Sequence, residues 1–287
     1  MRYYKLRDRS TERLVAADET RAYDLTAARS ELQSFRDLAK AASVAESTVD
    51  EIAERHLDPA NEITHSHLSD AQGLPATPDE VWAAGVTYRI SEEARKDESD
   101  TPEMYLDVYD ADRPEIFFKA TPSRTVGPDD TVGIRADSNW NVPEPELGIV
   151  LYRGETVGYT VGNDMSSRSI EGENPLYLPQ AKVYEKCCSL GPCVRTDIDD
   201  PNNLGITMTI HRDGDRVYSD QTSTAKMVRG YDELVSYFTA HNSVPELTVL
   251  LTGTSLVPDE EFTLREGDRV DIDIENIGVL SNPITEV

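Results

Sequence analysis

Lysine is scarce in this chain, which has seven lysines beside twenty-one arginines and 54 acidic residues among its 287 residues. The formal net charge at pH 7 is −26. Such a composition is typical of halophilic proteins, since a strongly hydrated, self-repelling surface stays dispersed in salt. The lack of clustered Lys and Arg argues against nucleic acid as a partner, because counterion release at phosphates needs such clusters. Anionic membrane surfaces are disfavoured for the same reason.

Long apolar runs are absent as well. No stretch approaches the ~20 apolar residues that span a bilayer. The first ten residues, MRYYKLRDRS, contain no apolar signal-peptide core. These two absences predict a cytoplasmic protein.

Cysteine is rare, and its three copies, Cys187, Cys188 and Cys193, lie close together. An odd number of cysteines in a cytoplasmic chain argues against a disulfide framework. No histidine lies nearby in the sequence to complete a zinc site. We therefore expect these cysteines to be small buried apolar residues.

The pattern along the chain predicts two parts, a small N-terminal α/β domain at 1–72 and a strand-rich domain at 73–287. The stretch GLPATP at 73–78 is typical of a loop between them. No internal repeat or low-complexity segment occurs. The coarse prediction is a β-rich α+β fold with peripheral helices. The main expected elements are strands at 3–6, 14–17 and 268–277, and helices at 31–42, from 47 onward, and at 229–241.

The most informative segment is WNVPEPELGIVLYRGETVGYTVGNDMSSRS, residues 140–169. Residues two apart on a strand point to the same side, so Glu144 and Glu146 share a face. A hairpin centred on Gly154 would place residue 144 opposite Asp164, because each is ten residues from the centre. Three converging carboxylates repel one another, and a hard divalent cation, Mg²⁺ or Mn²⁺, is the usual remedy.

The alternative is that this Glu-x-Glu pair lies on a solvated strand edge, as is common in so acidic a chain. The apolar run LGIVL at 147–151 argues against it, because it predicts a strand that is buried on both faces. Buried strands rarely carry unpaired glutamates. The metal site is therefore the better prediction.

The block PEPELGIV…GYTVGNDMSSRS resembles the signature of the fumarylacetoacetate hydrolase superfamily. FFKATPSRTVGP at 117–128 resembles the preceding strand and loop of that family, and LTGTSLVPDE…LREGDRVDIDIENIGVLSNPI at 251–284 resembles its C-terminal segment. The resemblance covers roughly residues 78–287. It implies a mixed β-sandwich-roll as the catalytic core.

Two further blocks resemble one subgroup, the archaeal 2-keto-3-deoxy-pentonate dehydratases. They are DADRPEIFFKATP at 110–122 and ENPLYLPQAKVYEKCCSLGP at 173–192. The subgroup acts in oxidative pentose breakdown. The resemblance thus implies a lyase that converts a 2-keto-3-deoxy-D-pentonate (arabinonate or xylonate) to 2,5-dioxopentanoate. It also implies a homodimer or homotetramer.

The same resemblance implies roles for individual residues. Glu144, Glu146 and Asp164 would hold Mg²⁺, or Mn²⁺, as a Lewis acid for a small 2-keto acid. Lys182 would stabilise the developing enolate or the substrate carboxylate. Lys119 would bind substrate or, equally well, support the metal carboxylates through an ion pair.

Four other assignments concern the substrate. Glu115 would be a general base or acid, with its pKa raised by partial burial, and Arg113 would clamp a carboxylate or hydroxyl. Thr254 would place its hydroxyl on the substrate carboxylate, and Arg168 would orient groups near the ligands. The alternatives are an exposed Arg113–Glu115 ion pair and an ordinary strand threonine at 254.

The chain departs from the wider superfamily at one important point. Many of its hydrolases carry a His and, three residues later, a Glu that together activate water. Here those positions hold Ser91 and Ala94, and Glu92 or Glu93 would be only a partial substitute. This departure counts against the first rival function, an acylpyruvate hydrolase, but not against an oxaloacetate decarboxylase.

A second departure is Ser169, where the family usually has Asp. A second rival, a non-catalytic metal-binding protein, would be expected to have lost ligands or the lysine. Those residues are all present. The sequence therefore favours an enzyme.

Overall fold

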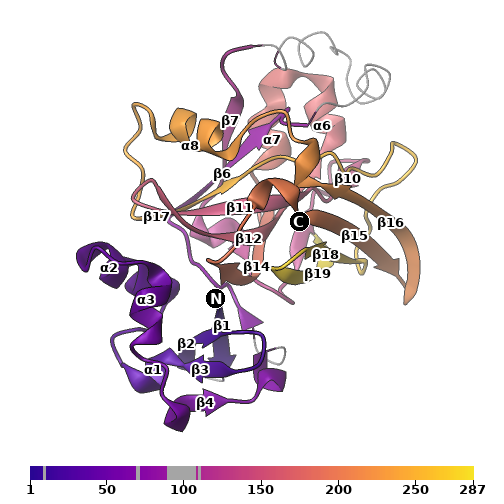
Figure 1. Cartoon of the computed structure of the whole chain (residues 1–287). Helices are drawn as coiled ribbons and strands as arrows, with labels where there is room; N and C mark the ends of the chain where they lie inside the picture. Colours follow the sequence, from indigo (N-terminus) through magenta and orange to yellow (C-terminus); the bar gives the residue numbers. More distant parts are fainter. Residues whose placement is uncertain (9–10, 69–71, 89–107, 109–110) are drawn as a thin grey trace.

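The computed structural model describes residues 1–8, 11–68, 72–88, 108 and 111–287. Strands dominate the part that follows the N-terminal region, as Figure 1 shows. The expected β-rich α+β class is confirmed. Among the described residues, no helix is long and apolar enough to cross a membrane.

The largest sheet has the strand order β4-β3-β2-β1-β14-β12-β11-β17-β6-β7, with β5 paired to β1 and β8 paired to β14. Most neighbours are antiparallel, whereas β17 and β6 run parallel. The bounds are β1 Arg2–Asp8, β2 Thr11–Ala17, β3 Ala22–Asp24, β4 Glu62–Ile63, β5 Gln72–Gly73, β6 Glu80–Gly85, β7 Glu115–Ala120, β8 Thr125–Val126, β11 Pro145–Tyr152, β12 Glu155–Asp164, β14 Cys188–Arg195 and β17 Leu247–Leu251.

A second sheet has the order β16-β15-β18-β19-β9. Val270, Ile272 and Ile274 alternate with more exposed residues along β18, as their spacing predicts. This sheet packs against the first one through contacts of β12 and β14 with β18 and β19, so the main core lies between the two. The bounds are β9 Val132–Ile134, β15 Gly205–Arg212, β16 Asp215–Ser223, β18 Arg269–Ile274 and β19 Gly278–Glu286, and a separate pair is formed by β10 Asn141–Val142 and β13 Ser166–Ser167.

The helices are short and peripheral. In Figure 1, α6 and α7 lie together above the large sheet, and α2 and α3 lie over the indigo N-terminal strands. The α-helices of the described residues are α1 Leu25–Ala28, α2 Phe35–Val44, α3 Val49–Glu54, α6 Arg168–Glu173, α7 Leu178–Lys182 and α8 Tyr231–Thr239. The 3₁₀ helices are η1 Pro59–Asn61, η2 His65–Leu68, η3 Pro122–Arg124, η4 Pro175–Tyr177, η5 Pro201–Asn203 and η6 Thr224–Lys226.

Capping residues set the limits of the N-terminal helices. α2 begins at Phe35, later than the expected residue 31, because the side chain of Ser34 accepts the Asp37 N–H and caps the first turn. Thr48 and Glu51 form a reciprocal capping box at the start of α3, which confirms the helix start predicted there. The starts of these two helices are thus set by capping side chains, which predict them more accurately than the spacing of apolar residues does.

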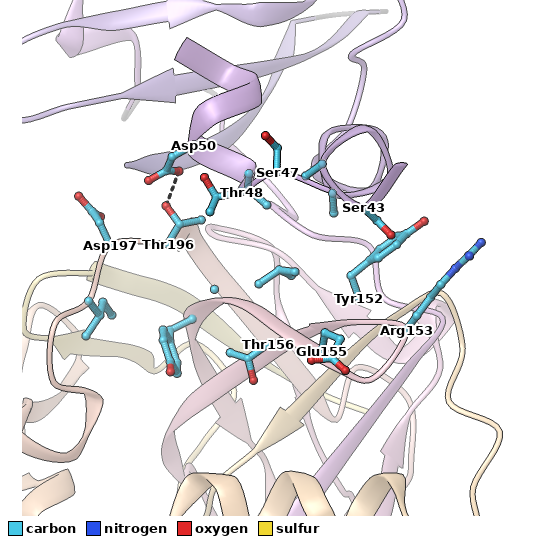
Figure 2. Close-up of a pocket in the computed structure, with 17 residues that line it drawn as sticks. Ser43, Ser47, Thr48, Asp50, Tyr152, Arg153, Glu155, Thr156, Thr196 and Asp197 are labelled. Atoms are coloured by element: carbon cyan, nitrogen blue, oxygen red, sulfur yellow. Dashed lines mark hydrogen bonds between the residues drawn. The ribbon is translucent and has the colours of Figure 1, made fainter. Parts of the chain in front are cut away.

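The N-terminal region continues the large sheet, because β1 pairs with β14. A hollow of about 650 Å³ lies between α2 and α3 on one side and the turn end of the β11–β12 hairpin on the other (Figure 2). Asp50 on α3 accepts a 2.6 Å hydrogen bond from Thr196, which directly follows β14. On the α2 side, the Arg36 guanidinium lies 3.5 Å from Glu246, which accepts a hydrogen bond from Tyr152 at the hairpin end.

The three cysteines are free and buried, as expected. Cys188 and Cys193 lie on β14 in the core, and burial raises the pKa of the Cys193 thiol to about 12. They behave as apolar core residues.

Candidate active site

The β11–β12 hairpin brings distant carboxylates together. Its register pairs Pro145 with Asn163, and the Asp164 N–H donates to the Glu144 carbonyl at 2.9 Å. Arg153 and Gly154 both have positive φ, 52° and 88°, as in the two-residue turns that match the twist of a hairpin. The predicted pairing of position 144 with position 164 is confirmed.

Glu144, Glu146 and Asp164 form a buried cluster. One oxygen of each lies within 4.8 Å of one oxygen of the others, and every residue of β11 is buried. The predicted convergence of the triad on a buried strand is therefore confirmed. Like charges this close need a cation or a proton, because burial removes the screening by water.

In the part of the chain that the structure describes, three cationic side chains surround the triad. Lys182 Nζ lies 2.8 Å from Glu144 Oε2 and 3.2 Å from Asp164 Oδ2. Lys119 Nζ lies 2.5 Å from Asp164 Oδ1, and an Arg168 nitrogen lies 3.1 Å from Glu144 Oε1. The site is thus a network of buried charges rather than an uncompensated acidic patch.

The surrounding charges and burial shift the pKa values of Glu144 and Glu146 in opposite directions. Burial, together with the charges of Asp164 and Glu144, raises the pKa of Glu146 well above its ordinary value. Burial also acts to raise the pKa of Glu144, but the charges of Lys182 and Arg168 outweigh it and lower that pKa to about 2. Burial alone would lower the pKa of Lys182, yet Asp164 and Glu144 raise it well above the ordinary lysine value. Glu146 is therefore the triad carboxylate on which burial and the neighbouring negative charges act most strongly.

A glycine turn after β17 holds Glu146 in place. The Gly253 N–H donates to Glu146 Oε2 at 2.6 Å. Gly253 has φ +86°, and a Cβ at this position would lie 2.1 Å from Thr87 Oγ1 and 2.8 Å from the Ala84 carbonyl. Only glycine fits here, because both the backbone conformation and the space exclude a side chain.

A small cavity of about 40 Å³ opens beside the triad. Glu115, the first residue of β7, reaches it across Gly85, its partner on β6. A Cβ on Gly85 would lie 2.0 Å from Glu115 Oε2, so the missing side chain leaves the space that this carboxylate occupies. Besides the triad and Glu115, the polar side chains that line the cavity within the described residues are Arg168, Glu171, Lys182 and Thr254.

Other expected site residues lie elsewhere. Arg113 is exposed, with its guanidinium over the ring of Tyr237 at 5.5 Å, and is not among the residues that line the cavity. Lys119 is fully buried beside Asp164 and donates to the carbonyls of Met165 and Lys182, a position suited to fixing the Asp164 side chain.

Positions 91–94, where the hydrolase dyad would lie, are outside the described residues. Ser169 is described and shares a 2.8 Å hydrogen bond with Ser138. At position 169 this chain therefore forms a pair of hydroxyl groups where the family usually has the carboxylate of an Asp.

Glu171 is a cavity residue that the sequence interpretation missed. It lies three positions after Arg168 on α6, so the two share a helix face. Its Oε2 accepts from Ser166 at 3.0 Å, and its Oε1 lies 3.8 Å from an Arg168 nitrogen. The spacing after Arg168 was the available signal, but the many acidic residues of the chain hid it.

The donor set fits a hard divalent cation. Within the described residues, Glu144 Oε1 and Asp164 Oδ1 are buried, and they are held by the ion pairs with Arg168 and Lys119 rather than by a hydrogen bond of good geometry. Among the described residues, the five carboxylates of the triad, Glu115 and Glu171, when ionised, exceed the three cationic side chains by two charges. A divalent cation held by the triad would balance them, with oxygen ligands of the kind that Mg²⁺ and Mn²⁺ prefer.

The family described as fumarylacetoacetate (FAA) hydrolase C-terminal matches residues 80–285. This chain belongs to the fumarylacetoacetate hydrolase family. It is 60% identical, over 100% of both chains, to a protein of Haloferax volcanii named probable 2-keto-3-deoxyxylonate dehydratase. It is 43% identical, over 73% of both chains, to the 2-dehydro-3-deoxy-D-arabinonate dehydratase of Saccharolobus solfataricus.

A solved structure of a 2-keto-3-deoxy-D-arabinonate dehydratase, complexed with magnesium and 2,5-dioxopentanoate, is also similar. It matches with a TM-score of 0.84 and 34% identity, over 100% of this chain and 99% of that one. The likeness covers the N-terminal region as well as the catalytic part.

Proposed function

We propose that this protein is a Mg²⁺-dependent hydro-lyase that converts a 2-keto-3-deoxy-D-pentonate to 2,5-dioxopentanoate and water. The observation that carries the proposal is the buried carboxylate triad, with Lys182 beside it and Glu115 facing the same cavity. The names of the relatives, one of them identical at 60% of positions, support the choice of substrate.

The triad would hold the cation, with Lys119 and Arg168 fixing Asp164 and Glu144 through ion pairs. When bound, Mg²⁺ would polarise the ketone of the substrate as a Lewis acid and so acidify the hydrogens on C3. Lys182 stands beside the triad as a fixed ammonium that can stabilise a developing enolate or hold the substrate carboxylate.

Glu115 is the proposed base, because it faces the cavity without belonging to the triad. It would accept a proton from C3, and the electron pair would form the enolate. The C4–O bond then breaks, and the hydroxyl leaves as water with a proton from an acid in the cavity. Loss of a C5 proton and return of a proton to C3 give an enol whose tautomer is the C5 aldehyde.

The remaining substrate assignments stay proposals. Thr254 lies on the cavity wall, and its Oγ1 accepts the Leu256 N–H, which leaves the hydroxyl hydrogen free for a substrate oxygen. Arg113 could contact substrate only by leaving the Tyr237 ring. We expect the protein to act in the cytoplasm, where its buried cysteines stay reduced, as a homodimer or homotetramer that light scattering would identify.

The first experiment is product analysis with 2-keto-3-deoxy-D-xylonate in high salt, with Mg²⁺ and then with EDTA. We expect 2,5-dioxopentanoate to appear only with the metal. Turnover of oxaloacetate or an acylpyruvate instead would move the function to decarboxylation or hydrolysis on the same site. Failure with all three would favour a non-catalytic metal-binding protein.

The assignment of the base has its own test. Glu115→Gln should bind Mg²⁺ like the wild type, because residue 115 is outside the proposed ligand set, while kcat falls about 100-fold or more. Full turnover by this variant would eliminate Glu115 as the base.

A further inference from the structure

The cavity wall holds a further carboxylate, Glu171, outside both the proposed ligand set and the proposed base. Glu171 lines the same cavity as the triad, but among the described residues the group of potential metal ligands consists of Glu144, Glu146 and Asp164 alone. The side chain of Glu171 is 12% exposed. Burying a charged carboxylate costs free energy, so a carboxylate this enclosed is expected to have a partner or a function.

The position of Glu171 is held by its neighbours. Ser166, on β13, donates to Oε2, and Arg168, one helical turn earlier on α6, faces Oε1 at 3.8 Å, beyond hydrogen-bond distance. An ionised carboxylate can accept several hydrogen bonds and donates none. Glu171 Oε1 therefore keeps capacity to accept a hydrogen bond from a ligand in the cavity.

The chemistry of a hydroxylated 2-keto acid supplies the donor. Its ketone and carboxylate would be occupied at the triad, which leaves the hydroxyls at the other end to be recognised. Lys182 and Arg168 can only donate hydrogen bonds, and Glu115 is engaged in proton transfer. Glu171 is thus the carboxylate on this wall that is left for a terminal hydroxyl.

We propose that Glu171 determines substrate specificity by accepting a hydrogen bond from the terminal hydroxyl of the sugar acid and by repelling 2-keto acids that carry a carboxylate at that end. This inference rests on the proposed function. A buried acceptor discriminates strongly against a ligand that lacks the matching donor, and a like charge at the same point discriminates against dicarboxylates.

The test compares Glu171→Gln with the wild type, both loaded with Mg²⁺. Three compounds share the 2-keto acid end: 2-keto-3-deoxy-D-xylonate, its 5-deoxy analogue 4-hydroxy-2-oxopentanoate, and 2-oxoglutarate, which has a carboxylate at C5 and lacks the 4-hydroxyl. We expect the KM of the first to rise about tenfold or more. The Ki of the second should stay within about twofold, and that of 2-oxoglutarate should fall.

The matched control is Glu173→Gln, the same charge change on the same helix at an exposed residue outside the cavity. It should alter none of the three constants. Parallel weakening of all three ligands by Glu171→Gln would show a merely structural role and overturn the proposal, as would no change at all.

The outcome is separable from that of the proposed function. If wild-type protein forms no 2,5-dioxopentanoate, the proposed reaction fails. Calorimetric titration of the same three compounds would still show whether Glu171→Gln changes the preference among them, and an unchanged preference would overturn the specificity role.

Discussion

At the scale of single residues, Glu146 is the least favourable member of the triad in its ionised form, because its carboxylate is buried among like charges. Glu146→Gln keeps the shape of the side chain and removes one charge. We expect the Kd for Mg²⁺ to rise about 100-fold or more, as isothermal titration would measure. An unchanged Kd would exclude Glu146 as a ligand.

The same substitution should also change how the Tm depends on pH when EDTA keeps the protein free of metal. A carboxylate whose pKa is raised in the folded state stabilises the fold below its unfolded pKa, and this contribution is lost as the pH rises toward the folded pKa. The Tm of Glu146→Gln minus that of the wild type should therefore increase as the pH rises from about 4.5. A difference independent of pH would contradict the raised pKa.

Gly253 is the second residue whose replacement has a defined outcome. Gly253→Ala should lower the free energy of unfolding by about 2 kcal/mol or more, because strained φ and steric overlap act together. Gly214→Ala is a matched control, with φ +87° but open space around the added carbon, and should cost only about 1 kcal/mol. Equal losses in denaturant titrations would remove the argument from steric overlap.

At the scale of elements, the paired strands β6 and β7 position the proposed base. Gly85→Ala would put a methyl group where the Glu115 carboxylate lies, and that side chain can swing away at little cost to the fold. We expect kcat to fall about 100-fold with a small change in Tm. The double variant Gly85→Ala/Glu115→Gln should be no slower than Glu115→Gln, and an additive loss would show that Gly85 acts by another route.

The elements also show where sequence patterns succeed and fail. The hairpin and the pairing of 144 with 164 could be predicted from the turn residues and the alternation of side chains. The bulge between Val150 and Leu151 could not, although it shifts the register by one residue from the Tyr152–Glu155 pair at the turn to the Pro145–Asn163 pair. The start of α2 could not be predicted from apolar spacing, because the Ser34 cap decides it. The place of Arg113 is a tertiary matter, since the ring it covers belongs to α8, more than a hundred positions later in the chain.

At the scale of the whole molecule, the net charge of −26 should make stability depend on salt. The Debye length falls from ~10 Å at 0.1 M to ~3 Å at 1 M, so added salt screens the mutual repulsion of the acidic surface. Between 0.1 and 2 M KCl, in EDTA, we expect Tm to rise by about 5 °C or more, roughly 2 kcal/mol for a chain of this size. A calorimetric scan with a constant or falling Tm would contradict this expectation.

The sequence by itself determined the features that depend on near neighbours along the chain: the strand-rich class, the hairpin, and the meeting of Glu144, Glu146 and Asp164 across it. Only the tertiary structure decided what surrounds them. Lys182 reaches the triad from α7, and the Gly253 N–H that holds Glu146 comes from 107 residues further along. The physical reason is that strand alternation and turn geometry are local, whereas a buried charge takes its partners from whichever segments the packed core brings within a few ångströms.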